Sequence, residues 1–204
     1  MQSLAVQLRD AIVAVGSDPE VGCIVLRGAG GSFCSGMDLK VSGPDLANEP
    51  VTAWVGVHQA LYRCPVPVVV GLERFAINAG AALLFAGDLS VAGESSFAQV
   101  SEIAMGVGAP MCQAWLHLRH SVAVGDRVTL IGDRIPAVEL LRLGLVNEVV
   151  PDDQVVARAR ELADRIAGHP PAGRRAVGAI WRRLRSNPAD PDAWFASLAS
   201  AVTP

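Results

Sequence analysis

Hydrophobic residues along this chain form two kinds of pattern, short apolar runs and longer stretches with helical spacing. Short apolar runs next to Gly, Pro or charged residues are typical of buried strands, and they occur at 23–28, 66–72, 89–95 and 145–151. Helical patterns occur at 4–15, 51–62, 79–88, 109–120, 121–132 and 136–144. The stretch 79–88 is small and apolar throughout, which favours a buried helix over a strand.

Strands therefore alternate with helices as far as Pro151, and helices dominate after it. This order predicts an α/β protein with a core at 1–150 and a C-terminal helical region at 151–204. The length of 204 residues suits one domain, or one domain with a small appendage. With 51% hydrophobic but only 5% aromatic residues, the core is expected to consist mainly of Ala, Val and Leu.

Charge and cysteine usage exclude several classes of protein. The net charge of −3 argues against a nucleic-acid partner, and the arginine-rich stretch 173–185 fits the solvated face of a helix. No apolar run is long enough to span a bilayer and the N-terminus lacks a signal-peptide pattern, so a cytoplasmic protein without a membrane partner is expected. The cysteines form no CxxC pair, and His117 and His120 lack a carboxylate neighbour, so no metal site is expected.

A glycine-rich turn, GGSFCSGMDLK, runs from Gly30 to Lys40, the only lysine of the chain. It follows a predicted strand, so its backbone N–H groups could hold an anion or a developing oxyanion. Taken alone, such a composition more often marks an ordinary turn.

A second turn of small residues, FAINAGAALLFAGD, follows the predicted strand at 66–72. Asn78, Ala79 and Gly80 stand where a buried helix would begin, and the first turn of a helix carries unpaired N–H donors. Two such turns could hold one carbonyl oxygen between them. The same small residues could also serve only to let the helix pack tightly.

Glu102 lies in the stretch SSFAQVSEIAMGVGAP, which is otherwise small and mostly apolar. An apolar setting raises the pKa of a carboxyl group and suits it to be a general acid or base. The alternative is a surface glutamate on a loop, and the residues alone leave both interpretations open.

Together these segments resemble the crotonase superfamily, the enoyl-CoA hydratase/isomerase family. GGSFCSGMDLK is similar to its first oxyanion loop, VPVVVGLERFAINAGAALLFAGDLSVA to its second oxyanion segment, SSFAQVSEIAMGVG to its acid/base segment and LIGDRIPAVELLRLGLVNEVVP to the motif before its terminal helices. The resemblance implies a spiral of ββα units, a C-terminal region that forms homotrimers or hexamers, and an acyl-CoA substrate whose coenzyme A replaces any separate cofactor.

The resemblance also implies roles for individual residues. The N–H groups of Met37 and Ala79 would form the oxyanion hole, and Glu102 would be the acid/base. The positions that would contact the substrate or its CoA are Ser35, Gly36, Met37, Asp38, Leu39, Lys40, Asn78 and Gly80.

This sequence departs from the family pattern at Ala82, where hydratases carry the first of two glutamates. One remaining glutamate suits double-bond isomerisation better than hydration. Alternatives are a catalytically silent acyl-CoA-binding protein and, more weakly, a thioester hydrolase, although Cys34 and Cys112 are expected to be packing thiols. The family's N-terminal strand is also missing, so either the native chain begins upstream or a strand edge is exposed.

Overall fold

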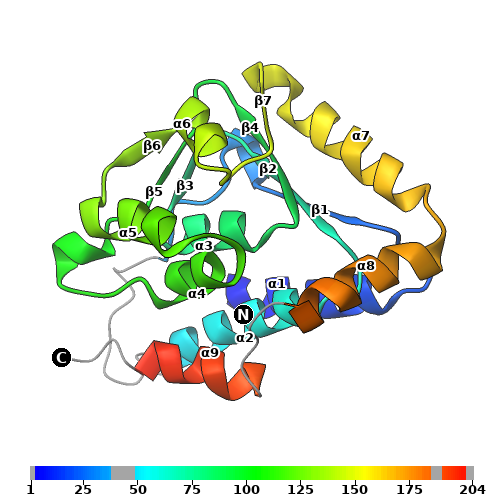
Figure 1. Cartoon of the computed structure of the whole chain (residues 1–204), viewed down its shortest axis with the longest axis horizontal. Coiled ribbons are helices and arrows are strands. Elements are labelled where there is room, and N and C mark those ends of the chain that lie inside the picture. Colours follow the sequence, from blue (N-terminus) through cyan, green and yellow to red (C-terminus); the bar gives the residue numbers. More distant parts are fainter. Residues whose placement is uncertain (1–2, 38–48, 185–189, 201–204) are drawn as a thin grey trace.

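The computed structural model describes residues 3–37, 49–184 and 190–200 (Figure 1). Its strands are β1 (Ile24–Arg27), β2 (Val68–Leu72), β3 (Phe75–Ile77), β4 (Leu89–Gly93), β5 (Phe97–Gln99), β6 (Arg134–Pro136) and β7 (Glu148–Val150). Its helices are α1 (Leu4–Ser17), α2 (Glu49–Arg63), α3 (Ala79–Ala86), α4 (Pro110–Arg119), α5 (Val122–Ile131), α6 (Ala137–Arg142), α7 (Val155–Ala167), α8 (Pro171–Leu184) and α9 (Pro191–Ser200). The described residues also form the short 3-10 helices η1 (Ala29–Gly31), η2 (Glu102–Met105) and η3 (Asp152–Gln154).

The strands form two sheets, and the chain passes repeatedly from one to the other. The larger sheet is parallel with the order β1-β2-β4-β7, and β1 lies at its edge within the described residues. The smaller sheet has the order β3-β5-β6, in which β3 and β5 are parallel and β6 is antiparallel. The strand pair β2–β3 and the strand pair β4–β5 are each followed by a helical segment, so the repeating unit is ββα.

Alternate residues of the larger sheet face two different hydrophobic clusters, as the pleat of a strand requires. Val68, Val70 and Leu72 point into the main core, which also contains most of the buried side chains of α2, α3 and α4. Val69 and Val91 face the opposite way and pack with the buried side of α7, which lies along this sheet (Figure 1). The larger sheet is therefore covered on both faces.

The C-terminal helices differ in how far they are buried. Helix α9 packs against α2 and α4, and its Phe195 is completely buried among their aromatic side chains. Helix α8 instead leaves Val177, Ile180 and Trp181 more than half exposed. Within the described residues, no helix combines the length and apolarity that crossing a bilayer would need.

Candidate active site

Three parallel segments of the smaller sheet end side by side. Cys34 forms a parallel bridge with Ala76 in β3, and β3 pairs in register with β5, so that Ile77 lies opposite Gln99. Parallel strands direct their carboxyl ends to the same edge of a sheet. The turns that follow Cys34, Ile77 and Gln99 are therefore brought together, and they carry the three segments that the sequence singled out.

The first turn fits closely against the second. The Ile77 N–H donates to the Cys34 carbonyl at 3.0 Å, which continues the ladder into the first turn. Gly36 then adopts φ 99°, and a Cβ there would lie 3.1 Å from the Ile77 carbonyl and 3.8 Å from the Ala79 nitrogen. A glycine is needed because this backbone is both left-handed and crowded. It brings Gly36, the residue before Met37, beside the start of α3.

Ala79 is the first residue of α3, so its N–H has no acceptor within the helix. It also has no hydrogen-bond acceptor among the other described residues. The following residue, Gly80, packs against the first turn: a Cβ at this position would lie 2.8 Å from the Cys34 Cβ and would collide with the Cys34 backbone. Gly80 is thus required for packing the two turns together, and its contact with the substrate or its CoA stays a prediction.

Glu102 begins η2 at the end of the third segment and is partly buried. Its Oε2 is buried and has no hydrogen-bond partner among the described residues. Burial raises the pKa of this carboxyl, while a hydrogen bond with its own backbone lowers it by less. A carboxylate whose pKa is raised and whose buried oxygen has no fixed partner is suited to exchange a proton with a ligand.

Cys112, in the first turn of α4, is completely buried next to this carboxylate. Burial, and after it the charge of Glu102, holds the pKa of the Cys112 thiol well above its ordinary value. Its Sγ donates to the Asn78 carbonyl at 3.4 Å. Glu102, Cys112 and the N-cap of α3 therefore form one cluster, and the thiol stays protonated, as expected of a packing residue.

The remaining predicted site residues are placed as follows. Ser35 lies on the first turn, whereas Asp38, Leu39 and Lys40 lie outside the described residues. The side chain of Asn78 contacts Ser101, a residue that the sequence pattern did not single out. Contact of these positions with CoA stays a prediction.

Ala82, where the family pattern has the first of its two glutamates, is 1% exposed in α3. Its N–H donates at 3.1 Å to the same Asn78 carbonyl that accepts from Cys112. This position therefore belongs to the cluster around Glu102, but a methyl group cannot take or give a proton.

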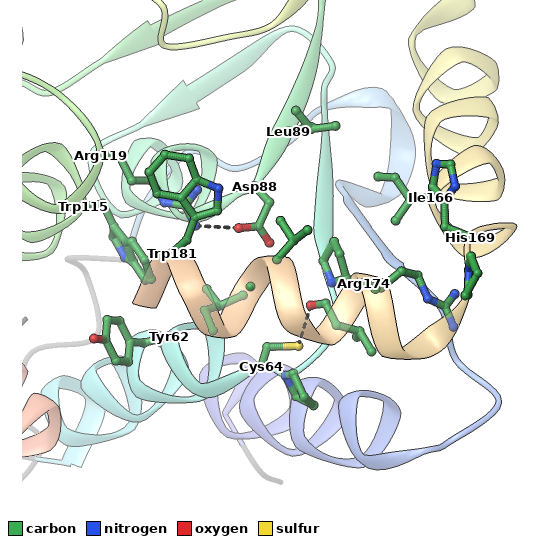
Figure 2. A pocket seen from close by; sticks show the side chains of 18 residues that line it. Tyr62, Cys64, Asp88, Leu89, Trp115, Arg119, Ile166, His169, Arg174 and Trp181 are labelled. Carbon is green, nitrogen blue, oxygen red and sulfur yellow. Dashed lines mark hydrogen bonds and ion pairs between the residues drawn. The ribbon is translucent and has the colours of Figure 1, made fainter. Parts of the chain in front are cut away.

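A cavity of about 700 Å³ lies elsewhere, between the end of α2, the end of α4 and α8 (Figure 2). It reaches Asp88, two residues beyond the end of α3, and contains none of the predicted catalytic residues. The Asp88 carboxylate accepts at 3.0 Å from Arg119 and at 2.9 Å from the Val68 N–H. Each Asp88 carboxylate oxygen thus already accepts a hydrogen bond, so this carboxylate is a poorer candidate for acid/base chemistry than Glu102.

The described residues contain no group of three or more His, Cys, Asp or Glu side chains that could hold a metal ion. His117 has its ring 6.1 Å from that of Trp194, a packing contact between α4 and α9. The acid/base cluster around Glu102 is accordingly the site with the clearest chemical capability in this part of the chain.

Comparisons with known proteins identify the family. The family model described as enoyl-CoA hydratase/isomerase matches residues 1–192. Enoyl-CoA hydratase EchA19 of Mycobacterium tuberculosis is 34% identical over 186 residues, which cover 87% of this chain and 68% of the relative. The 1,2-epoxyphenylacetyl-CoA isomerase of Escherichia coli is 28% identical over 190 residues, covering 88% and 71%.

Solved structures show the same architecture. An enoyl-CoA hydratase from Bacillus anthracis aligns with a TM-score of 0.83 at 23% identity, over 98% of this chain and 80% of that one. This likeness confirms the predicted fold, an α/β spiral of ββα units followed by helices.

Proposed function

The chain belongs to the enoyl-CoA hydratase/isomerase family, and on that premise we propose that it moves a double bond within an enoyl-CoA thioester. Glu102 is the single acid/base in this proposal, and the N–H groups of Met37 and Ala79 bind the thioester oxygen. The observation that carries the proposal is the contrast between two positions in one cluster. One carboxylate oxygen of the partly buried Glu102 is buried and has no hydrogen-bond partner among the described residues, whereas Ala82 offers no second carboxylate.

The proposed reaction needs only one group that takes a proton and returns it. The Glu102 carboxylate removes a proton from the carbon next to the thioester carbonyl of a 3-enoyl-CoA. The electrons left behind spread over a dienolate, whose negative oxygen accepts hydrogen bonds from the Met37 and Ala79 N–H groups. Such preorganised donors typically contribute about 3 kcal/mol each. The protonated Glu102 then returns the proton two carbons further along, and no atom is gained or lost.

Hydration would place different demands on the site. Water must be activated by one group while another delivers or holds a proton, which family hydratases accomplish with two carboxylates. At Ala82 this chain has only a methyl group beside Cys112, whose thiol is protonated at neutral pH. The site therefore supports isomerisation better than hydration.

Two other functions fit the same fold less well. Thioester hydrolysis through a cysteine would need a thiolate, and the raised pKa of Cys112 disfavours one at this position. Acyl-CoA binding without turnover would leave no purpose for a carboxylate with one oxygen buried and unpaired, which is costly.

The test is turnover of 3-enoyl-CoA and of 2-enoyl-CoA by the wild type and by E102Q. We expect the wild type to isomerise the first faster than it hydrates the second, and E102Q to lose at least about 100-fold in isomerisation. The matched control is E20Q, which makes the same exchange at an exposed turn.

Undiminished isomerisation by E102Q would rule out Glu102 as the base. Tight acyl-CoA binding by calorimetry, combined with no turnover of either substrate by the wild type, would instead favour the silent binding protein.

A further inference from the structure

We propose that Asn78 is a positioning residue, whose side chain fixes the oxyanion donor Ala79 relative to Glu102 by accepting two hydrogen bonds from Ser101. The inference rests on the proposed function for the roles of Ala79 and Glu102. The inference goes beyond that function by assigning to Asn78 and Ser101 a role in holding Ala79 and Glu102 at a fixed separation.

The contacts of Asn78 join the start of α3 to the Glu102 segment and to α4. Its Oδ1 accepts from the Ser101 N–H at 2.8 Å and from the Ser101 hydroxyl at 3.1 Å. Its own N–H donates to the Gln99 carbonyl at 2.8 Å, which extends the ladder between β3 and β5 by one residue. Its carbonyl accepts from the Ala82 N–H and the Cys112 thiol.

The backbone of Asn78 makes this side chain unexpected. It adopts φ 53° and ψ −111°, a conformation that glycine reaches freely and that strains a residue with a Cβ. The strain must be offset by the surrounding structure, and strained residues of this kind gather at functional sites. The paired hydrogen bonds to Ser101 are interactions that glycine could not make, so they supply a physical reason for asparagine here.

The positions of the partners show what these bonds control. Asn78 immediately precedes Ala79, and Ser101 immediately precedes Glu102. Ala79 and Glu102 are therefore each the next residue after one end of the Asn78–Ser101 contact. Because catalysis falls steeply when reacting groups are displaced by about 1 Å, fixing this separation affects turnover more than binding.

The same contact holds Glu102 in its buried position. From α4, the titratable group that faces this carboxylate is the Cys112 thiol. From α5, which packs against η2, the sequence supplies Asp126 and Arg127, and Arg127 is ion-paired with Asp133 at 2.7 Å. If the contact with Ser101 is lost, Glu102 gains freedom to move towards solvent, which would bring the pKa of its carboxyl back towards the ordinary value.

The test compares N78G, S101A and the double variant N78G/S101A. Glycine keeps the backbone conformation and removes Oδ1, whereas S101A removes only the hydroxyl donor. We expect N78G to lower kcat about tenfold with KM changed less than about twofold, and S101A to lower kcat about threefold. In the double variant kcat should equal that of N78G, because the hydroxyl has lost its acceptor.

A second measurement does not depend on activity. The carboxyl carbon of Glu102 can be titrated by NMR in protein labelled at glutamate, with its resonance identified by its absence in E102Q. We expect the titration midpoint to move to lower pH in N78G and, by less, in S101A. The control is S96A, because the Ser96 hydroxyl donates at 2.7 Å to Gly93, outside this cluster.

Two results would overturn the proposal. The first is a Glu102 titration midpoint in N78G and S101A that equals that of the wild type. The second is a loss of kcat on S101A substitution that is equal in the wild-type and N78G backgrounds. Failure of the proposed function has a different signature, namely full turnover by E102Q, and the NMR titration still decides on Asn78 in that case. If N78G does not fold, the Glu102 midpoint in S101A, compared with the wild type and S96A, decides the proposal.

Discussion

Acid should destabilise this protein through His58, a completely buried residue of α2. The Trp115 indole N–H donates to His58 Nδ1 at 2.8 Å, so the neutral ring carries its proton on Nε2. A second proton would have to enter at Nδ1, where it would face the indole N–H. The Trp54 ring packs edge-on against the His58 ring, with 4.5 Å between the ring centroids, and the Phe195 ring stacks on the imidazole. A charged imidazole would therefore gain no hydration.

The size of the effect follows from the two pKa values. Burial lowers the pKa of His58 from its ordinary 6.5 to about 3. Between these values the unfolded chain binds a proton that the folded chain does not, so the free energy of unfolding falls as pH falls below about 6.5. The loss is negligible at pH 7.5 and about 2 kcal/mol at pH 5, which is a large share of a typical total stability of about 5–15 kcal/mol.

The assay is urea unfolding of the wild type and H58Q at pH 7.5 and pH 5. Glutamine does not titrate, and its side-chain oxygen can still accept from Trp115. The change in the wild type's free energy of unfolding between the two pH values should exceed that of H58Q by about 2 kcal/mol. Taking this difference cancels the contributions that titratable groups shared by both proteins, including Glu102 and His120, make to the pH dependence. The variant H169Q controls for the exchange itself at an exposed histidine.

Equal pH dependence in the wild type and H58Q would refute the reasoning. It would mean that His58 titrates alike in the folded and unfolded chain, and hence that the cluster of α2, α4 and α9 admits water.

Further predictions concern the cluster around Glu102. Replacing Ala82 with Glu should introduce hydration of 2-enoyl-CoA, measured by loss of the conjugated absorbance, because it restores a second carboxylate beside the first. The kcat/KM for isomerisation should rise with pH as Glu102 ionises, with its midpoint above the ordinary value for a glutamate. G80A should lower the free energy of unfolding by about 2 kcal/mol or more through its clash with Cys34, whereas G173A, whose added Cβ meets nothing within 4 Å, should change it little.

The hydrophobic pattern predicted the long elements but missed the smaller sheet. Strands β3, β5 and β6 have three residues each, too few to show a period, and two of them follow a predicted strand after a short turn. Their pairing nevertheless determines the site. The Asn78–Ser101 and Asn78–Cys112 contacts join residues 23 and 34 positions apart, and only the register of β3 and β5 brings them together.

Other features could be predicted from the residues themselves. Glycine and alanine in the two turns indicated close backbone approach, and Gly36 and Gly80 show it. The sequence left the burial of Glu102 open because its surroundings come from α4, which begins eight residues later. The burial of His58 was missed for a similar reason, since it depends on Phe195 in the last helix.

The chemistry around Glu102 favours one charge in this cluster. A second buried carboxylate at position 82 would repel Glu102, and the two would share their protons as a coupled pair. With alanine there and a protonated thiol at Cys112, burial alone is the main influence on the pKa of Glu102. A group that must take a proton from one carbon and return it to another works best when neither of its forms is strongly preferred. The loss of the second carboxylate and the raised pKa of the first therefore support the same proposed reaction, in which one glutamate serves both steps.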